Sequence, residues 1–315
     1  MQTSIKPTYY WFLLSYGSTK SLFMVSFFVL ILLAIPHALS GSSPNEWARL
    51  GKTTNASFFS VERAKVFAHF SNAAYCSAES LANWSCGPCK SADPTFSAKV
   101  IEGSWGGTQA FVGSTKGSIV ISFRGSSNIQ NWIKNLEFAK HKAYPKCNGC
   151  EVHSGFYGAW EEIQGRVVAE IERLLVLDPK ALIYITGHSL GAALAVLCAA
   201  EIGASSHSLG YPIEGVYTFG QPRVGNLAFH NFYGKGSHVN WRLTHSHDIV
   251  PHLPMEWIGY VHTNTEIFWD ENSTKYTICD HTGEDQTCSD QFLSNTWSIS
   301  DHFVYVNVTI CDCLF

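Results

Sequence analysis

The sequence predicts an α/β fold in which a mostly parallel sheet carries helices on both faces. Strand-like runs alternate with helical runs between residues 117 and 310, a pattern typical of sheets whose strands are joined by helical crossovers. Residues 181–186 (ALIYIT) are almost entirely apolar, as expected of a strand buried on both faces of a sheet. No internal repeat, low-complexity tract or Pro/Ser-rich linker follows residue 50, so these elements belong to one domain.

The individual elements follow from local pattern. Residues 117–123 (GSIVISF) are rich in β-branched side chains and predict a strand. Residues 160–177 place apolar side chains at helical spacing, and Asp178–Pro179 ends this helix. A second helix is expected from Ser189 to about residue 202, directly after the apolar strand. Further strands are expected at residues 216–219, 239–244 and 303–310.

Composition excludes several classes of protein. Only 15% of the 315 residues are charged, against about 25% in an average globular chain, and 46% are hydrophobic. These values argue against a disordered chain or a coiled coil. The formal net charge of −4 argues against nucleic acid as the main partner, because phosphate binding needs a basic surface.

The N-terminal segment has the pattern of a secretory signal. Residues 21–35 (SLFMVSFFVLILLAI) are uncharged and apolar, and Lys6 and Lys20 are the charged residues of the first forty. Ala38 and Ser40 supply the small residues of a cleavage site. We therefore expect a signal peptide over residues 1–40, a mature domain over 41–315, and secretion.

A signal anchor that stays in the membrane is the alternative. A spanning helix needs about 20 apolar residues, whereas this run is shorter and ends at Pro36. Cleavage removes two lysines and no acidic residue, so the net charge of the mature chain becomes −6.

Ten cysteines agree with export, because secreted proteins use cysteines as disulfide staples. A zinc site built from two CxxC units is disfavoured, since the units are too far apart for a zinc ribbon. Cys198 lies in an apolar helical run and is expected to be a buried free thiol. The candidate bridges join Cys86 with Cys89, Cys147 with Cys150, Cys279 with Cys288, and Cys76 with either Cys311 or Cys313. Four N-glycosylation sequons of the mature chain lie at Asn55, Asn83, Asn272 and Asn307.

The most informative segment joins the apolar strand to its helix. Residues 185–193 read ITGHSLGAA and contain the G-x-S-x-G pattern at Gly187, Ser189 and Gly191. Glycines at these positions allow a sharp turn that lifts the serine hydroxyl clear of the sheet. The helix start directs N–H groups and a positive dipole toward a reacting oxygen.

A serine hydroxyl needs a general base, and the base needs an orienting carboxylate. In α/β-hydrolases the chain order is Ser, then Asp or Glu, then His. Asp248 follows a predicted strand, and His302 precedes the last one, so both are candidates. A metal cluster at His245, His247 and Asp248 is disfavoured, because no second group of ligands has matching spacing.

These motifs resemble those of the secreted fungal-type lipases, the class 3 lipases of the α/β-hydrolase fold. The resemblance extends from about Tyr75 to Cys311, and the motifs are closest to those of filamentous-fungal triacylglycerol lipases. The matching segments are residues 122–126 (SFRGS), 131–133 (NWI), 186–191 (TGHSLG), 219–226 (FGQPRVGN), 248–254 (DIVPHLP) and 301–302 (DH).

The resemblance implies roles for particular residues. Ser189 is the implied nucleophile, Asp248 the orienting acid and His302 the base of a mechanism with an acyl-enzyme intermediate. The implied oxyanion hole uses the backbone N–H of Leu190 together with Ser126. The resemblance also implies a disulfide from Cys76 to a C-terminal cysteine, and it implies no metal and no cofactor.

Residues 127–135 (SNIQNWIKN) predict a short amphipathic helix next to Ser126. Ile129, Trp132 and Ile133 fall on one face, together with Leu136. Similarity to the lipases identifies this helix as a lid, whose apolar face covers the site in water and turns toward lipid at an interface. An ordinary helix packed on the sheet is the alternative.

The sequence therefore predicts a monomeric secreted hydrolase of lipid esters that acts at an oil–water or membrane interface without an obligate protein partner. Two alternatives remain. Gly191–Ala192 departs from the second glycine of many lipases and is similar to feruloyl esterases of the same family, which act on soluble esters. A non-catalytic lipid-binding protein with a degenerate hydrolase fold is the alternative from another class.

Other residues near these motifs are expected to be structural. Arg223 is expected to pair with a carboxylate near the site, and Asp301 to act as a cap or a solvated residue. Four aromatic residues are expected in the core: Trp257, Tyr260, Phe268 and Trp269.

Overall fold

The computed structural model describes residues 58–104, 107–115, 117–145, 147–203, 211, 213–236, 238–263 and 265–314. The predicted signal peptide, its boundary with the mature domain and the sequon at Asn55 lie outside the described residues. Within the described ranges, no helix is long and apolar enough to cross a lipid bilayer.

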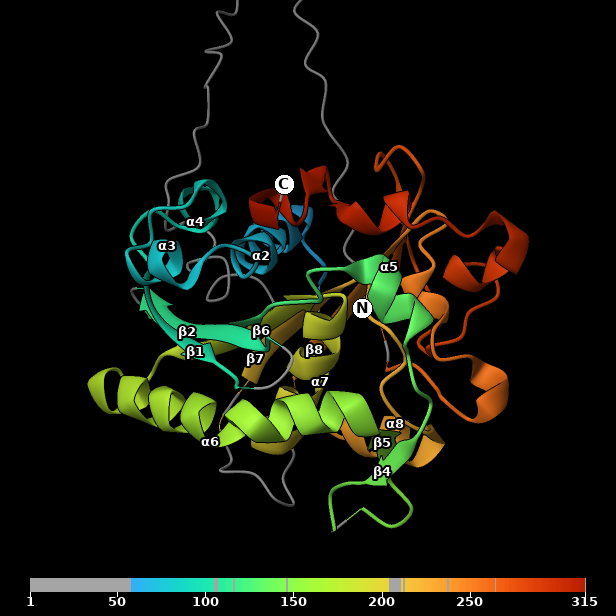
Figure 1. The fold of residues 1–315 in the computed structure, drawn as a ribbon, viewed down its shortest axis with the longest axis horizontal. Helices are drawn as coiled ribbons and strands as arrows, with labels where there is room; N and C mark the ends of the chain where they lie inside the picture. Colours follow the sequence, from blue (N-terminus) through green and yellow to red (C-terminus); the bar gives the residue numbers. More distant parts are fainter. Residues whose placement is uncertain are drawn as a thin grey trace, which may run out of the picture. The chain divides into compact units, whose positions relative to one another are not determined.

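A large mixed sheet forms the centre of the described domain (Figure 1). Its strand order is β1-β2-β3-β6-β7-β8-β9-β10. The strands β3, β6, β7, β8 and β9 run parallel, and β1, β2 and β10 are antiparallel to their neighbours. Their bounds are Ser97–Glu102 (β1), Gln109–Thr115 (β2), Ser118–Phe123 (β3), Leu182–His188 (β6), Ile213–Phe219 (β7), Val239–His245 (β8), Glu266–Trp269 (β9) and Tyr276–Ile278 (β10).

Helices cover both faces of this sheet (Figure 1). On one face lie α2 (Val61–Ala73), α3 (Ala78–Ala82) and α4 (Gly87–Ala92), and on the other lie α6 (Ser154–Leu177), α7 (Leu190–Gly203) and α8 (Leu227–Tyr233). Alternate residues of each strand point to opposite faces, so Ile119 and Ile121 pack with α6 and α7, whereas Val120 packs with α2. The predicted mostly parallel α/β sheet is confirmed.

The smaller elements connect and close the domain. They are α5 (Ile129–Lys134), the two-stranded sheets β4 (Lys140–Lys142) with β5 (Glu151–His153) and β11 (Val304–Tyr305) with β12 (Val308–Thr309), and the 3₁₀ helices η1 (Val250–His252), η2 (Glu256–Ile258), η3 (Ser289–Gln291), η4 (Ser294–Thr296), η5 (Ser300–Phe303) and η6 (Asp312–Leu314).

Two predicted elements have different bounds in the structure. The helix expected at residues 160–177 begins at Ser154, because the His153 side chain caps it by accepting the N–H groups of Gly155 and Phe156. The single strand expected at residues 303–310 is wrong. Val306 and Asn307 have φ of 48° and 60°, which turns the chain back on itself into the β11–β12 hairpin.

Four disulfides connect the described cysteines, and they pair Cys76 with Cys313, Cys86 with Cys89, Cys147 with Cys150, and Cys279 with Cys288. Cys311 was a wrong candidate: its thiol is buried and free, as is that of Cys198. Asn72 accepts the N–H groups of Cys311 and Asp312 and holds this turn, so that Cys313 in the following 3₁₀ helix reaches Cys76.

The aromatic residues expected in the core divide into two groups. Tyr260 and Trp269 are buried and Phe268 is half-buried. Trp257 is 83% exposed, so its assignment to the core was wrong. It lies on η2, a single turn that ends at Gly259 in the left-handed region and buries no side chain.

Candidate active site

The turn between β6 and α7 holds Ser189 in a strained backbone conformation. Ser189 has φ of 60°, which a residue other than glycine rarely adopts. A Cβ on Gly187 would lie 2.2 Å from the Gly191 carbonyl oxygen, and one on Gly191 would lie 2.1 Å from the Phe123 carbonyl oxygen. Both glycines of the G-x-S-x-G pattern are therefore required by close packing of backbone against backbone.

The parallel strands bring the other candidate segments to the same edge of the sheet. Phe123, His188, Phe219 and His245 are the last residues of β3, β6, β7 and β8, and parallel strands end on one side. Gly125 lies directly against the serine turn, since a Cβ on it would be 3.1 Å from Cβ of Ser189.

The Asp248 carboxylate binds the imidazole of His302. Oδ2 of Asp248 lies 2.8 Å from Nδ1 of His302, and Oδ1 accepts the N–H of Val250 at 2.8 Å. The Tyr305 hydroxyl also donates to Oδ2, and burial followed by the Asp248 charge raises the pKa of Tyr305 well above 10.0. Tyr305 was missed by the sequence analysis, because no motif distinguishes it.

This hydrogen bond determines which nitrogen of His302 is available. A carboxylate accepts, so Nδ1 of the neutral ring carries the proton and Nε2 is left with a lone pair. His302 and Ser189 are fully buried, and neither Nε2 nor the Ser189 Oγ has a hydrogen-bond partner among the described residues. Such catalytic hydrogen bonds are often long without substrate and tighten in the complex.

Contacts with neighbouring residues place His302 next to the serine turn. The His302 ring lies 4.3 Å, between ring centroids, from the ring of His188, the residue that precedes Ser189. A Cβ on Gly220 would lie 2.7 Å from Cε1 of His302, and Gly220 has φ of 56°. The N–H of Ser189 donates to the carbonyl of Phe219. Phe219 precedes Gly220, so this hydrogen bond connects the serine turn to the segment that packs against His302.

The two predicted oxyanion donors, Leu190 and Ser126, belong to segments that lie next to Ser189. Leu190 is the first residue of α7, and the N–H groups of a first helical turn have no partner within the helix. Ser126 follows Gly125 in the loop after β3. The predicted roles of these two residues stay predictions.

The amphipathic segment forms α5 close to this turn. Asn128 caps the helix by accepting the N–H of Asn131, and Ile129 is buried whereas Trp132 and Ile133 are half-buried. Trp132 stacks on Phe156 with ring centroids 6.2 Å apart. Its predicted role as a lid stays a prediction.

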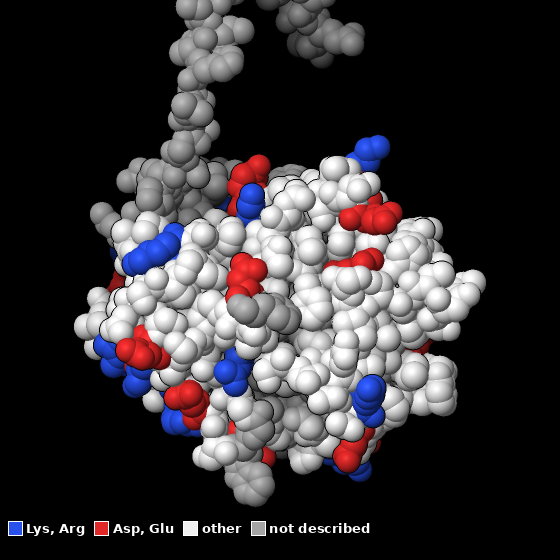
Figure 2. Space-filling model, turned by 45° about the horizontal axis from the view of Figure 1, so that its top comes forward, with Lys and Arg blue, Asp and Glu red and all other residues white. Residues whose placement is uncertain are grey.

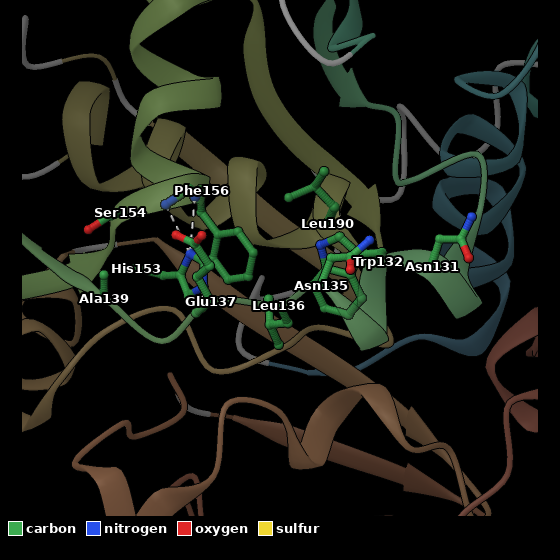
Figure 3. Close-up of a pocket in the computed structure, with 11 residues that line it drawn as sticks. Asn131, Trp132, Asn135, Leu136, Glu137, Ala139, His153, Ser154, Phe156 and Leu190 are labelled. Carbon is green, nitrogen blue, oxygen red and sulfur yellow. Dashed lines mark hydrogen bonds between the residues drawn. The ribbon is translucent and has the colours of Figure 1, made fainter.

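Two hollows adjoin α5. A cavity of about 390 Å³ is bounded by Trp132, Leu136, Phe156 and Leu190, whose side chains surround a common space in Figure 3. A second, of about 210 Å³, is lined by residues 124–128 and by residues of α5 and α7. Trp132 and Leu190 line both hollows, so the helix adjoins the residue that follows Ser189.

The surface in this region lacks a concentration of charge. In Figure 2, which brings the upper part of Figure 1 forward, the face is mostly uncharged, and the charged side chains on it are of both signs and intermixed. Glu266, Cys279 and Cys288 are the one group of three potential metal ligands that lie together among the described residues, and its two cysteines are joined in a disulfide.

The predicted structural residues near the site behave as expected. Arg223 is buried and binds Glu284 at 2.6 Å and Asp290 at 3.3 Å. Asp301 accepts hydrogen bonds from the N–H of His247 and the hydroxyl of Ser298.

Comparison with known proteins agrees with this geometry. The sequence model of the lipase (class 3) family matches residues 120–257. A solved structure of the triacylglyceride lipase from Rhizomucor miehei superimposes with a TM-score of 0.72 and 30% identity, over 80% of this chain and 96% of that one. The chain belongs to the class 3 lipase family.

Other relatives extend the comparison. The lipase sequence of Rhizomucor miehei is 36% identical over 73% of this chain, and secreted mono- and diacylglycerol lipase 1 of Fusarium solani is 35% identical over 65%. The chain spans 64% and 62% of the length of these two curated relatives. Another solved structure, at 30% identity and TM-score 0.72, is a triacylglycerol lipase with a serine protease triad at its catalytic centre.

Proposed function

We propose that this protein hydrolyses carboxylic esters of lipids, above all acylglycerols, through an acyl-enzyme on Ser189. One observation carries the proposal: a strained, buried serine adjoins a histidine whose Nδ1 is bound by a buried carboxylate and whose Nε2 is free. The related lipases of Rhizomucor miehei and Fusarium solani support the assignment to lipid esters.

In the proposed reaction, Oγ of Ser189 attacks the ester carbonyl while Nε2 of His302 takes the hydroxyl proton. Asp248 stabilises the resulting imidazolium and keeps the ring oriented. The oxyanion is bound by the N–H of Leu190 and by Ser126, each donor lowering the barrier by about 3 kcal/mol. His302 then protonates the leaving alcohol, and a water molecule repeats the sequence on the acyl-enzyme to release the fatty acid.

We assign α5 to a lid that moves when the enzyme meets a lipid surface. Ser189 and His302 are fully buried, so a substrate needs a conformational change to reach them. Ile129, Trp132 and Ile133 supply the apolar face that turns toward lipid. The walls of the 390 Å³ cavity at Trp132, Leu136, Phe156 and Leu190 have the apolar character that suits an acyl chain.

We further propose that the protein is secreted as a monomer after removal of residues 1–40, with one lipase domain over residues 41–315. Four disulfides support an oxidising compartment. Asn83, Asn272 and Asn307 are exposed, as glycan acceptors must be. N-terminal sequencing and a glycosidase shift of the secreted protein test these assignments.

The purified mature protein and its Ser189→Ala variant test the reaction. We expect hydrolysis of emulsified triacylglycerol and labelling by a fluorophosphonate, both absent from the variant. Faster turnover of methyl ferulate than of acylglycerols would assign the enzyme to the feruloyl esterases instead. A wild-type protein that neither hydrolyses esters nor reacts with the probe would indicate a lipid-binding protein without catalysis.

A further inference from the structure

Two buried polar side chains next to the catalytic centre have no part in the proposed reaction. Tyr75 follows α2 at the start of the domain, and His188 is the last residue of β6. Tyr75 is 2% exposed and His188 is fully buried. The Tyr75 hydroxyl lies 2.7 Å from Nδ1 of His188, and Nε2 of His188 lies 2.8 Å from the backbone carbonyl oxygen of His302.

The direction of each hydrogen bond in this series, from Tyr75 through His188 to the His302 carbonyl, follows from the His302 carbonyl at one end. A carbonyl oxygen can only accept, so Nε2 of His188 carries a proton and donates it to His302. Burial, followed by the nearby His302, lowers the pKa of His188 well below 6.5, so the ring is neutral. Nδ1 of His188 therefore holds a lone pair and accepts the proton of the Tyr75 hydroxyl.

At the other end of this hydrogen-bonded series, Tyr75 reaches the loop after β3. The Tyr75 hydroxyl lies directly against the Gly125 backbone and also contacts the Cys311 thiol. The contact leaves no room for a side chain, since a Cβ on Gly125 would lie 2.0 Å from this oxygen. Gly125 immediately precedes Ser126, the proposed oxyanion donor.

We propose that Tyr75 and His188 are positioning residues. They keep the loop after β3, which carries Ser126, and the base His302 at fixed positions on either side of Ser189. The proposal rests on the proposed function of Ser189, His302 and Ser126. Tyr75 packs against the Gly125 backbone and hydrogen-bonds to His188, and His188 donates to the His302 carbonyl, so these contacts join two segments that lie 177 positions apart in the sequence. Without the Tyr75–His188 contacts, no hydrogen bond of this set would fix the position of His302 relative to Ser126.

Tyr75→Phe removes one hydroxyl and keeps the ring. Its matched control is Tyr144→Phe, because Tyr144 is also buried and its hydroxyl donates to the Leu197 carbonyl away from the site. The assay is hydrolysis of a water-soluble p-nitrophenyl butyrate, together with the rate of fluorophosphonate labelling and the melting temperature. We expect Tyr75→Phe to lower kcat and the labelling rate by about 10–100-fold with KM within about twofold. The control should match the wild type in both rates.

His188 provides a second, independent variant pair. In His188→Gln the side-chain amide can still donate to the His302 carbonyl, whereas in His188→Leu it cannot. The Gln variant should therefore recover much of the kcat lost in the Leu variant. A readout that does not need activity is the low-field proton resonance of the His302–Asp248 hydrogen bond, which should shift in Tyr75→Phe and stay unchanged in Tyr144→Phe.

The outcomes separate this inference from the proposed function. A Tyr75→Phe protein with wild-type kcat and an unshifted proton resonance overturns the positioning role while the lipase assignment stands. Equal losses of melting temperature and kcat in both tyrosine variants also overturn it, because they reveal a general packing role. An inactive wild type overturns the proposed function, and the resonance then decides the positioning role alone. If His188→Leu fails to fold, Tyr75→Phe carries the test.

Discussion

The Nδ1 atom of His302 lies 2.8 Å from Oδ2 of Asp248, although 54 residues separate the two in the chain. Both side chains are buried, and Tyr305 donates a second hydrogen bond to the same carboxylate oxygen. The carboxylate thereby fixes the tautomer of the ring, and this is the property that the proposed catalysis depends on.

Replacing that carboxylate tests the dependence. In Asp248→Asn the amide cannot act as a charged acceptor for Nδ1–H, so kcat should fall by about 10⁴-fold. Asp301→Asn is the matched control, because this neighbouring carboxylate binds the His247 N–H instead. Steady-state kinetics check the pair, and a larger loss in the Asp301 variant would contradict the assignment of the acid.

The second glycine of the G-x-S-x-G turn should tolerate no side chain. In Gly191→Ala the new Cβ meets the Phe123 carbonyl oxygen at 2.1 Å, so we expect destabilisation of about 3 kcal/mol. Gly158→Ala is the control, since its Cβ meets nothing within 4 Å, and alanine should stabilise helix α6 by up to about 1 kcal/mol. Denaturant unfolding measures both, and equal stabilities would refute the steric argument.

The two C-terminal cysteines should differ in their effect on stability. Cys313→Ser removes the disulfide to Cys76, which closes a long loop, and should cost about 2–5 kcal/mol. Cys311→Ser alters a free buried thiol and should retain the Cys76–Cys313 bridge. Peptide mapping under non-reducing conditions identifies the bridge, and a Cys76–Cys311 linkage in the wild type would show that the pairing is wrong.

The ion cluster around Arg223 should make stability depend on pH. Burial raises the pKa of Asp290, but the His252 hydrogen bond and the Arg223 charge outweigh it and lower the pKa to about 2. A depressed folded pKa stabilises the protein above the unfolded value of 3.8, and this contribution is lost as pH falls toward 2. Asp290→Asn should therefore lower Tm above about pH 4 and much less near pH 2. Thermal scans across this range test the prediction, and a constant loss of Tm would contradict it.

The α5 helix should control the response to an interface. Trp132→Ala removes the stacking on Phe156 that holds the helix in place, so the ratio of activity on emulsified to monomeric ester should fall about threefold or more. Lys134→Ala alters an exposed residue of the same helix and should keep the wild-type ratio. An unchanged ratio in the Trp132 variant argues against a lid.

Much of the fold could be predicted, because apolar strands, helical periodicity and the G-x-S-x-G turn are local patterns. The predictions that proved wrong concern segments in which the tertiary structure overrides the local sequence pattern. Residues 303–310 alternate like a strand, yet left-handed Val306 and Asn307 turn them into a hairpin. Trp257 is apolar, but its short turn projects it into solvent.

By itself, the sequence determined the α/β class, the serine turn with its two glycines, and the candidates Asp248 and His302, because each leaves a signal in spacing or in chain order. Only the tertiary structure decided that Cys313 rather than Cys311 binds Cys76. It also decided that Tyr75, His188 and Tyr305 bind the segments around the serine. Hydrogen bonds between segments far apart in the chain depend on how strands and loops are arranged at one sheet edge. A local sequence pattern carries no information about that arrangement.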